Sequence, residues 1–227
     1  MRTLTSRQMA EAERRADEAG VSYRQLMENA GAAAVRLIQR RGLPTAKETL
    51  IFVGSGNNGG DGYVAARLLA KAGAQVRLVL VEGEPRTEIS RCNRQRAQQL
   101  HIPELKPEAL PAPSLFEGLI VDAIYGTGFH GTLRENARQA ARWINAAPAA
   151  VFALDLPSGV GADTGESDPD AVRADVTIAF DSFKPAHQTT CAAPFCGESV
   201  QVDIGIPEGC HPDEKAAPFE KQERRTR

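Results

Sequence analysis

A glycine-rich stretch at residues 54–62 carries polar side chains that suit a binding site. It reads Gly-Ser-Gly-Asn-Asn-Gly-Gly-Asp-Gly and directly follows the apolar residues 50–53. Its five glycines let the backbone adopt positive φ angles and let a ligand approach closely, and free N–H groups at the start of a following helix suit a phosphate. Asn57, Asn58 and Asp61 add two amides and a carboxyl group, which a simple pyrophosphate cradle does not need. We therefore interpret the stretch as a ligand-binding loop and not as a plain connection.

The same stretch also fits the dinucleotide-binding pattern G-x-G-x-x-G through Gly54, Gly56 and Gly59. Glu82 ends the next apolar segment, where a ribose-binding acid stands in NAD-dependent enzymes. An NAD-dependent oxidoreductase is therefore one hypothesis, although it leaves the amides and the acid of the loop without a role.

Two more acidic residues accompany later apolar segments. Asp122 lies within residues 119–124, which run into a second glycine-rich loop at 126–132, and Asp155 follows Ala150–Leu154. In an open parallel sheet the carboxyl ends of the strands meet at one edge, where ligands bind. Three polar loops are therefore expected at that edge, and a ligand pocket is predicted there. Taken alone, Asp122 is also compatible with a role as a turn cap.

Alternating apolar strands and amphipathic helices predict an α/β fold. We expect a Rossmann-like, doubly wound and mostly parallel sheet with helices on both faces, in three α/β/α layers. Two capping boxes, Thr5 with Gln8 and Ser22 with Gln25, indicate where the first two helices begin. Residues 101–113 contain four prolines and are expected to be irregular. The expected strands are 50–53, 75–81, 119–124, 150–154, 176–180 and 200–206, and the expected helices include 23–40, 63–71, 85–99 and 134–145.

Length and composition limit the class of protein. The chain has 227 residues, of which 42% are hydrophobic and 25% charged, enough for one domain with a buried core. We predict a single domain over residues 1–206 and a charged, disordered tail over 207–227. A net charge of −2 and a pI near 6.1 offer no basic surface for nucleic acid or anionic lipid. The polar N-terminus and the short apolar runs predict a cytoplasmic protein without a membrane segment.

Four short motifs give the sequence a specific resemblance. They read Leu-Met-Glu-Asn-Ala-Gly at 26–31, Gly-Asn-Asn-Gly-Gly-Asp-Gly at 56–62, Asp-Ala-Ile-Tyr-Gly-Thr-Gly at 122–128 and Asp-Leu-Pro-Ser-Gly at 155–159. In this order they resemble the signatures of the NAD(P)H-hydrate epimerase family, the YjeF N-terminal domain, across nearly all of the predicted domain. One departure is visible: the family commonly has glycine soon after its late lysine, whereas this chain continues from Lys184 with Pro-Ala-His.

The resemblance implies a substrate and a cofactor. The substrate is NADH or NADPH hydrated at carbon 6 of the nicotinamide ring (NADHX or NADPHX), and the reaction interconverts its R and S epimers. The cofactor is a potassium ion, for which amide, carboxylate and hydroxyl oxygens are suitable hard ligands. By resemblance, the substrate-binding residues are Asn57, Asn58, Gly59, Gly60, Asp61, Gly126, Thr127, Gly128, Phe129, His130, Gly131, Thr132 and Asp155, and the potassium ligands are Asn58, Asp122 and Ser158.

The implied reaction requires a group that gives and takes a proton. The proton is needed whether the C6 hydroxyl group leaves to form an iminium ion or the ring opens to an aldehyde and recloses. Asp155 is the predicted catalytic residue, because the resemblance places this strand-end acid against the substrate. Lys184 is a candidate helper. The sequence leaves open which route is used and whether the NADH or the NADPH hydrate is preferred.

The resemblance also implies partners. The ATP-dependent dehydratase domain that is fused to many members is not recognised in this sequence. We therefore expect a separate ATP- or ADP-dependent dehydratase that acts on the S epimer, and we expect the protein to form a homodimer. A hypothesis from another class is a non-catalytic nucleotide-binding or interaction module on the same fold. That hypothesis would be favoured if the polar loop residues or the strand-end acids were missing, and they are present.

Overall fold

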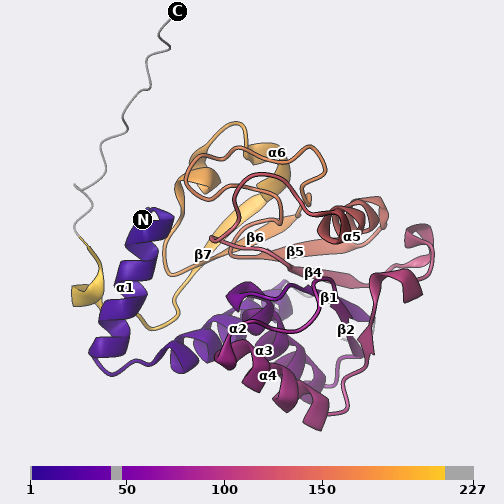
Figure 1. Cartoon of the computed structure of the whole chain (residues 1–227), viewed down its shortest axis with the longest axis horizontal. Helices are drawn as coiled ribbons and strands as arrows, with labels where there is room; N and C mark the ends of the chain where they lie inside the picture. Colours follow the sequence, from indigo (N-terminus) through magenta and orange to yellow (C-terminus); the bar gives the residue numbers. More distant parts are fainter. Residues whose placement is uncertain (1, 42–47, 213–227) are drawn as a thin grey trace, which may run out of the picture.

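The computed structural model describes residues 2–41 and 48–212. Its centre is a sheet of seven strands, all paired in parallel, in the order β3-β2-β1-β4-β5-β6-β7 (Figure 1). The chain builds the sheet in one direction from β1 and in the other from β4, so the topological switch point lies between these two strands. The strands are β1 (Thr49–Val53), β2 (Val76–Leu80), β3 (Glu104–Leu105), β4 (Leu119–Ala123), β5 (Ala150–Leu154), β6 (Val176–Phe180) and β7 (Glu198–Val202).

Helices cover both faces of this sheet, which confirms the predicted three-layer α/β fold. Figure 1 shows α2, α3 and α4 on one side of the sheet and α5 on the other. None of the helices within residues 2–41 and 48–212 is both long and apolar enough to cross a lipid bilayer. The helices are α1 (Ser6–Glu18), α2 (Tyr23–Arg40), α3 (Asn57–Lys71), α4 (Glu88–Gln99), α5 (Glu135–Ala146) and α6 (Ala193–Cys196), with 3-10 turns η1 (Pro107–Ala109), η2 (Pro113–Leu115), η3 (Pro185–Gln188) and η4 (Glu208–Cys210).

The strands feed two cores, one on each face of the sheet. In β1, Ile51 and Val53 pack with side chains of α2 and α3, whereas Leu50 and Phe52 pack with side chains of α5. Successive side chains of a strand point to opposite faces, so a strand that is covered on both sides needs apolar residues at every position. This explains why the inner strands of the sheet read as largely apolar runs, which is the pattern used to predict them.

The glycine-rich stretch is only partly a loop. Helix α3 begins at Asn57, with Gly56 as its N-cap, so the second half of the stretch forms the first turns of the helix. Two glycines allow close backbone packing there: a Cβ atom on Gly54 would lie 2.0 Å from the carbonyl oxygen of Ile124, and one on Gly59 would lie 2.1 Å from the carbonyl oxygen of Gly54. The predicted helix start at residue 63 was wrong because glycines, which are poor helix formers, are retained here for packing.

The first two helices begin directly after Thr5 and Ser22, as the capping motifs predicted. Thr5 accepts a hydrogen bond from the Gln8 backbone N–H while the Gln8 side chain accepts one from the Thr5 N–H, which completes the first capping box. Ser22 accepts a hydrogen bond from the Gln25 N–H, but the Gln25 side chain donates to Asn29 instead of returning to Ser22. The second box is therefore half formed.

One strand was not predicted, and another differs from its predicted range by more than one residue at its ends. The segment 101–113, expected to be irregular, contributes the short edge strand Glu104–Leu105, which pairs with β2. The last strand covers Glu198–Val202 instead of 200–206, because its pairing with β6 starts at Glu198. Both strands lie at the edges of the sheet, where one side is unpaired and the apolar pattern is weak.

The described chain continues a little beyond the predicted domain end at residue 206. Cys210 is buried, and the His211 side chain lies 3.0 Å from the carboxylate of Asp181. Residues up to 212 therefore pack against the domain, while residues 213–227 of the predicted tail lie outside the described residues.

Candidate active site

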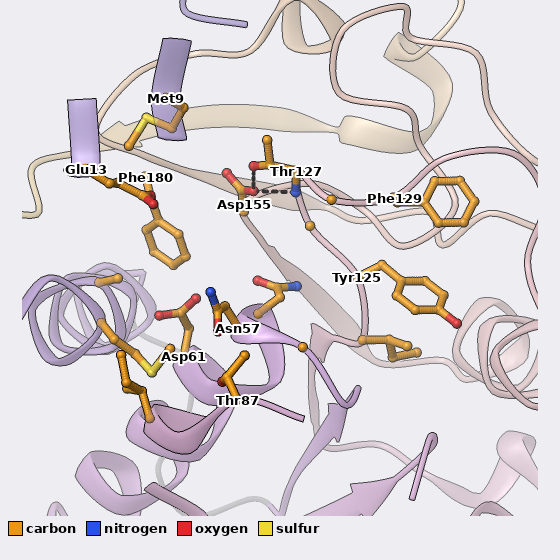
Figure 2. A pocket seen from close by; sticks show the side chains of 18 of the residues that line it. Met9, Glu13, Asn57, Asp61, Thr87, Tyr125, Thr127, Phe129, Asp155 and Phe180 are labelled. Atoms are coloured by element: carbon orange, nitrogen blue, oxygen red, sulfur yellow. Dashed lines mark hydrogen bonds between the residues drawn. The ribbon is translucent and has the colours of Figure 1, made fainter. Parts of the chain in front are cut away.

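A pocket of about 700 Å³ opens at the carboxyl edge of the sheet, where β1, β4 and β5 end and α3 begins (Figure 2). This is the switch point of the sheet, at which open α/β folds bind their ligands. Apolar side chains of α1 and α2 close one end of the pocket, among them Met9, Leu26 and Met27. The pocket that the three polar loops predicted is therefore present.

The structure brings many of the sequence-predicted site residues to this pocket and places others elsewhere. Gly59 and Gly60 are buried inside α3, and Asp122 and Ser158 are buried in contact with each other. His130, Gly131 and Thr132 form an exposed part of the second loop. The roles proposed for all of these residues stay predictions. The predicted residues that line the pocket are Asn57, Asn58, Asp61, Gly126, Thr127, Gly128, Phe129 and Asp155.

Asp155 stands directly after β5 with its carboxylate turned to the pocket (Figure 2). Its backbone has a φ of 63°, a left-handed conformation that is uncommon for a residue other than glycine and is often found at functional sites. One carboxylate oxygen, Oδ2, accepts hydrogen bonds from the Thr127 backbone N–H at 2.7 Å and from the Thr127 hydroxyl group. The other oxygen, Oδ1, lies 2.5 Å from the Lys184 Nζ atom. Partners therefore fix both oxygens of this carboxylate.

The pair of Asp155 and Lys184 is almost fully buried. Asp155 is 7% exposed and Lys184 is 1% exposed, and the Lys184 ammonium group also donates to the carbonyl oxygen of Phe180 at 3.0 Å. Burial by itself raises the pKa of Asp155, but the Lys184 charge and the hydrogen bonds from Lys184 and Thr127 outweigh it and lower that pKa below its ordinary value of 3.8. Asp155 is therefore ionised at neutral pH and available as a proton acceptor.

His187 connects the backbones of these two residues. Its Nδ1 atom accepts a hydrogen bond from the Lys184 N–H at 2.9 Å, and its Nε2 atom lies 2.9 Å from the Asp155 carbonyl oxygen. Because a carbonyl group only accepts, Nε2 carries the proton, and the imidazole is neutral. Burial and the neighbouring Lys184 charge lower the pKa of His187, which favours this neutral form. The departure from the family pattern after Lys184 thus introduces a side chain that braces the ion pair.

Asp122 is satisfied inside the protein. Its Oδ2 atom accepts from the Ser158 N–H at 2.7 Å, and its Oδ1 atom accepts from the Ser158 hydroxyl group at 2.6 Å and from the Ile124 N–H at 3.1 Å. Burial raises the pKa of Asp122 to about 6. The carboxylate caps the turn after β4 and ties it to the loop after β5, so the turn-cap interpretation of Asp122 describes its contacts well.

The side chain of Asn58, in contrast to that of Asp122, is not satisfied by hydrogen bonds within the described residues. Both polar atoms of its side chain are buried without a hydrogen-bond partner among residues 2–41 and 48–212. A Cβ atom on Gly126 would lie 2.8 Å from Asp155 Oδ2 and 3.2 Å from the Asn58 amide carbon, so the amide and the carboxylate converge on this glycine. A buried amide without a partner is costly, and a bound ligand or cation would satisfy it. Only the smallest residue fits between the two groups.

The residues predicted to hold potassium are oxygen donors of the required kind. Asp122 and Ser158 are in direct contact, and Asn58 offers an unsatisfied amide oxygen. Groups of three or more His, Cys, Asp or Glu side chains arranged to hold a metal ion do not occur in the part of the chain that the structure describes. Amide, carboxylate and hydroxyl oxygens suit hard cations in general, and the assignment of potassium to these residues stays a prediction.

The other end of the pocket carries positive charge. Arg86 and Arg134 line it together with Glu82. The Glu82 carboxylate, which the sequence placed as a ribose-binding acid, accepts hydrogen bonds from the Tyr125 hydroxyl group and, at 3.2 Å, from Ser55, and lies 3.3 Å from an Arg134 nitrogen. Burial, followed by the hydrogen bond to Glu82, raises the pKa of Tyr125, so its hydroxyl group stays protonated.

Sequence reasoning missed the contribution of α1. Glu13 and Met9 line the pocket from this helix, and Phe180 and Ile204 line it from the β6 and β7 side. One signal was available: Glu13 lies four residues after Met9, on the helix face that buries Met9 and Ala16. A carboxyl group on an otherwise apolar stripe marks a position that is not simply core.

Comparison with known proteins decides the family. The profile of the protein family described as YjeF-related protein N-terminus matches residues 23–186, which is more than half of the chain. The chain belongs to this family. The matched region of the YjeF N-terminal family includes Asn58, Asp122, Asp155 and Lys184, and so contains most of the site described above.

Curated relatives of two lengths are similar to this member of the YjeF N-terminal family. A protein of Pyrobaculum aerophilum named bifunctional NAD(P)H-hydrate repair enzyme Nnr is 44% identical over 214 residues, which cover 91% of this chain and 42% of that protein. A protein of Nitrosopumilus maritimus named NAD(P)H-hydrate epimerase is 37% identical over 208 residues, covering 90% of this chain and 95% of that protein. The chain thus spans less than half of the first relative and nearly all of the second.

A solved structure shares the fold. The crystal structure of the yeast protein ynu0 superposes with a TM-score of 0.72 at 24% sequence identity, and the superposition covers 82% of this chain and 83% of the yeast chain. At that identity the likeness concerns the fold, which agrees with the arrangement of strands and helices described here.

Proposed function

We propose that this chain is an NAD(P)H-hydrate epimerase, an isomerase that interconverts the R and S epimers of NADH or NADPH hydrated at carbon 6. One observation carries the proposal: the ionised carboxylate of Asp155, paired with Lys184, faces a large pocket at the switch point of the sheet. The name of the relative from Nitrosopumilus maritimus, which this chain matches over nearly its whole length, supports the same activity.

The charges along the pocket favour one orientation of the substrate. The start of α3 has no side-chain cap, and Arg86 and Arg134 stand at that end, so the negative diphosphate is favoured near these groups. The hydrated nicotinamide ring then lies at the end that holds Asp155, where Met9 and Phe180 provide apolar surface for the ring. In this orientation the reacting carbon 6 is close to the Asp155 carboxylate, which Lys184 and Thr127 hold in place.

The chemistry assigned to Asp155 is proton transfer. Lys184 keeps the carboxyl group ionised, and Thr127 holds it in one orientation. A positioned acid or base of this kind contributes about 10²- to 10⁴-fold to a rate. Asp155 serves equally in the iminium route and in the ring-opening route. The two routes differ in the fate of the C6 oxygen, since the iminium route exchanges it with water at every turnover.

Potassium is the proposed cofactor, with Asn58, Asp122 and Ser158 as its ligands. The unsatisfied amide of Asn58 and the oxygen donors of the buried Asp122–Ser158 pair support this assignment. A bound cation would offset part of the negative charge of the substrate diphosphate. The residues themselves tie the end of β4 to the loop after β5, and so position Asp155 next to the pocket.

We also propose a partner enzyme, an oligomeric state and a cellular location for this protein. A dehydratase that uses ATP or ADP and acts on the S epimer would complete the repair of the nucleotide, and the word "bifunctional" in the name of the Pyrobaculum relative is in keeping with two linked activities. A homodimer and a cytoplasmic location belong to the same proposal.

An epimer assay tests the activity directly. Purified R-hydrate of NADPH is incubated with the protein in potassium buffer and in sodium buffer, and the epimers are separated by chromatography. We expect the S epimer to appear much faster than without protein, and faster in potassium. In the Asp155→Asn variant, turnover should fall by about 10²- to 10⁴-fold because the proton-transfer group is lost, while binding of unhydrated NADPH persists.

A matched variant separates this effect from general damage. Asp170 is another ion-paired aspartate, bonded to Arg142 outside the pocket, and Asp170→Asn should turn over like the wild type. A folded wild-type protein that binds NADPH without accelerating epimerisation in either buffer would contradict the proposed activity and favour a nucleotide-binding module. Full activity of Asp155→Asn would contradict only the role of Asp155.

A further inference from the structure

Glu13 reaches the pocket from a helix that none of the recognised motifs includes. It lies on α1 and lines the pocket together with Asp61 and Asp155, which come from α3 and from the end of β5 (Figure 2). Within residues 2–41 and 48–212, the Glu13 carboxyl group forms neither a hydrogen bond nor an ion pair. Its neighbours Glu11 and Arg14, in contrast, pair with each other on the outer surface of the same helix. Glu13 is therefore a free carboxyl group that faces the substrate space.

Two carboxyl groups of the pocket, those of Asp155 and Glu13, have opposite electrostatic environments. Asp155 has the Lys184 ammonium group beside it, which lowers its pKa. Glu13 has no cation in contact, and burial, followed by the charge of Asp155, raises its pKa to about 7. Burial and the charges of Asp155 and Glu13 also raise the pKa of Asp61 well above its ordinary value. When two acids in one pocket are shifted in opposite directions, one is suited to accept a proton and the other to donate one.

The epimerisation proposed above needs both roles. We propose that Glu13 is the proton donor of this reaction and that it acts together with Asp155 as the proton acceptor. This inference rests on the proposed function, and it adds a second catalytic residue to it. The assignment follows from placement: the two carboxyl groups enter one pocket from different elements, and only one of them is neutralised by a buried lysine.

The protons and electron pairs balance in this scheme. In the iminium route, Glu13 protonates the C6 hydroxyl group, the C–O bond breaks, water leaves, and the nitrogen lone pair forms a C=N bond. Water then attacks carbon 6 from the other face, the C=N electron pair returns to nitrogen, and Asp155 takes the proton that the water loses. Solvent restores both groups for the next turnover. In the ring-opening route, Asp155 takes the hydroxyl proton while Glu13 protonates the departing ring nitrogen.

The charged and titratable groups around Glu13 set the expected pH dependence. They are Asp155, Asp61 and Asp181, which favour the protonated form, together with Lys184, which opposes it, and the Tyr23 hydroxyl group. A donor works only when it is protonated, so kcat should fall as the pH rises through about 7, the pKa of Glu13. The acceptor Asp155 is ionised throughout this range and contributes nothing to that fall.

The test compares kcat, KM and pH profiles of the wild type and three variants with the R-hydrate of NADPH as substrate. Glu13→Gln keeps the size of the side chain and removes its proton, so kcat should fall by about 10²-fold or more with little change in KM, and the fall in kcat near pH 7 should disappear. The matched control is Glu18→Gln, which changes an exposed acid on the same helix and should behave like the wild type. Glu13→Asp should restore part of kcat.

Each outcome has one meaning. A Glu13→Gln variant with wild-type kcat and an unchanged pH profile overturns the donor assignment while the epimerase activity stands. Failure of the wild-type protein to accelerate epimerisation is a different result and overturns the proposed function together with this inference. If Glu13→Gln does not fold, the wild-type profile decides: a decline of kcat through about pH 7 supports the donor, and a level profile overturns it.

Discussion

Asp122 and Asp155 occupy similar positions near the ends of the neighbouring strands β4 and β5, yet they have different surroundings. Asp122 is completely buried and bonds to Ser158 and to the backbone of the next turn, without lining the pocket. Asp155 also lies in the interior, but it faces the pocket and has Lys184 as a counterion. Burial alone raises the pKa of Asp122, whereas the counterion lowers that of Asp155. The position at a strand end therefore brings an acid to the site, and its partners decide what the acid does there.

Removal of Lys184, the counterion of Asp155, is expected to have the largest effect on the difference between Asp155 and Asp122. In Lys184→Met, the buried Asp155 loses the charge that keeps it ionised, so its pKa should rise. Breaking a buried ion pair by removing one partner costs about 3–5 kcal/mol, which urea unfolding would measure. Turnover that depends on the carboxylate is lost as the pH falls through the raised pKa, so the acidic limb of the pH profile should move to higher pH.

A surface lysine supplies the control for that experiment. Lys71 lies at the exposed end of α3, and Lys71→Met should leave both the unfolding free energy and the pH profile near wild type. If the acidic limb stays in place in Lys184→Met, then Lys184 does not set the ionisation of Asp155, and the two aspartates differ for another reason.

A substitution at Asp122 tests the other aspartate of this comparison, whose role we ascribe to hydrogen bonds and potassium binding. In Asp122→Asn, an amide N–H₂ group replaces one acceptor, so a buried Ser158 donor loses its partner, at a cost of about 1–3 kcal/mol. The proposed potassium site also loses its carboxylate. We expect the wild-type melting temperature to be higher in potassium than in sodium buffer and this difference to vanish in the variant. An equal ion effect in both proteins would remove Asp122 from the set of potassium ligands.

Loss of the His187 contacts with the Lys184 N–H and the Asp155 carbonyl oxygen is expected to have a smaller effect. In His187→Phe, the bonds to the Asp155 carbonyl oxygen and the Lys184 N–H are lost while the aromatic contact with Phe183 is retained, and we expect about a 10-fold loss of turnover. The pKa of His187 is below its ordinary value of 6.5 in the folded protein, so the unfolded chain binds the proton more readily. Stability should therefore fall as the pH drops below about 6.5 in the wild type and fall less in the variant.

Melting curves between pH 5 and pH 8 measure this contribution, with the range chosen around the ordinary imidazole pKa of about 6.5. The matched control is His101→Phe, since His101 is exposed and lies far from Asp155 in the sequence. Parallel curves for the wild type and His187→Phe would show that the imidazole does not carry the acid sensitivity.

Most of the fold was predictable because it is encoded by short stretches of sequence. Apolar runs placed five of the seven strands, and capping residues such as Thr5 and Ser22 placed the first helices. The errors fall where tertiary packing overrides local preference. Helix α3 begins within a glycine-rich stretch, since Gly59 must pass close to the backbone of Gly54. The short strand β3 is held by pairing with β2, which its own composition does not reveal.

The site was predictable to the level of the loops that form it. The sequence predicted that the polar loops meet at one edge of the sheet. In the structure, Asn58, Thr127 and Asp155 line a common pocket there. It did not show that Asn58 lacks a partner, because that depends on every atom around the amide. The carboxyl group of Glu13 on the apolar face of α1 marked an unusual position, but the sequence did not show that this face meets the pocket, since the position of a helix across a sheet edge has no local signal.

The sequence by itself determined most of the strands and helices, the polar loops at the carboxyl edge and the family motifs, because each depends on residues that are adjacent in the chain. Only the tertiary structure decided which carboxyl group of the pocket has a lowered pKa and which has a raised one. Lys184 reaches Asp155 from beyond β6, and Glu13 reaches the same pocket from the first helix. The pKa of a carboxyl group depends on its burial and on charges within a few ångströms, and folding brings those charges together from distant parts of the chain.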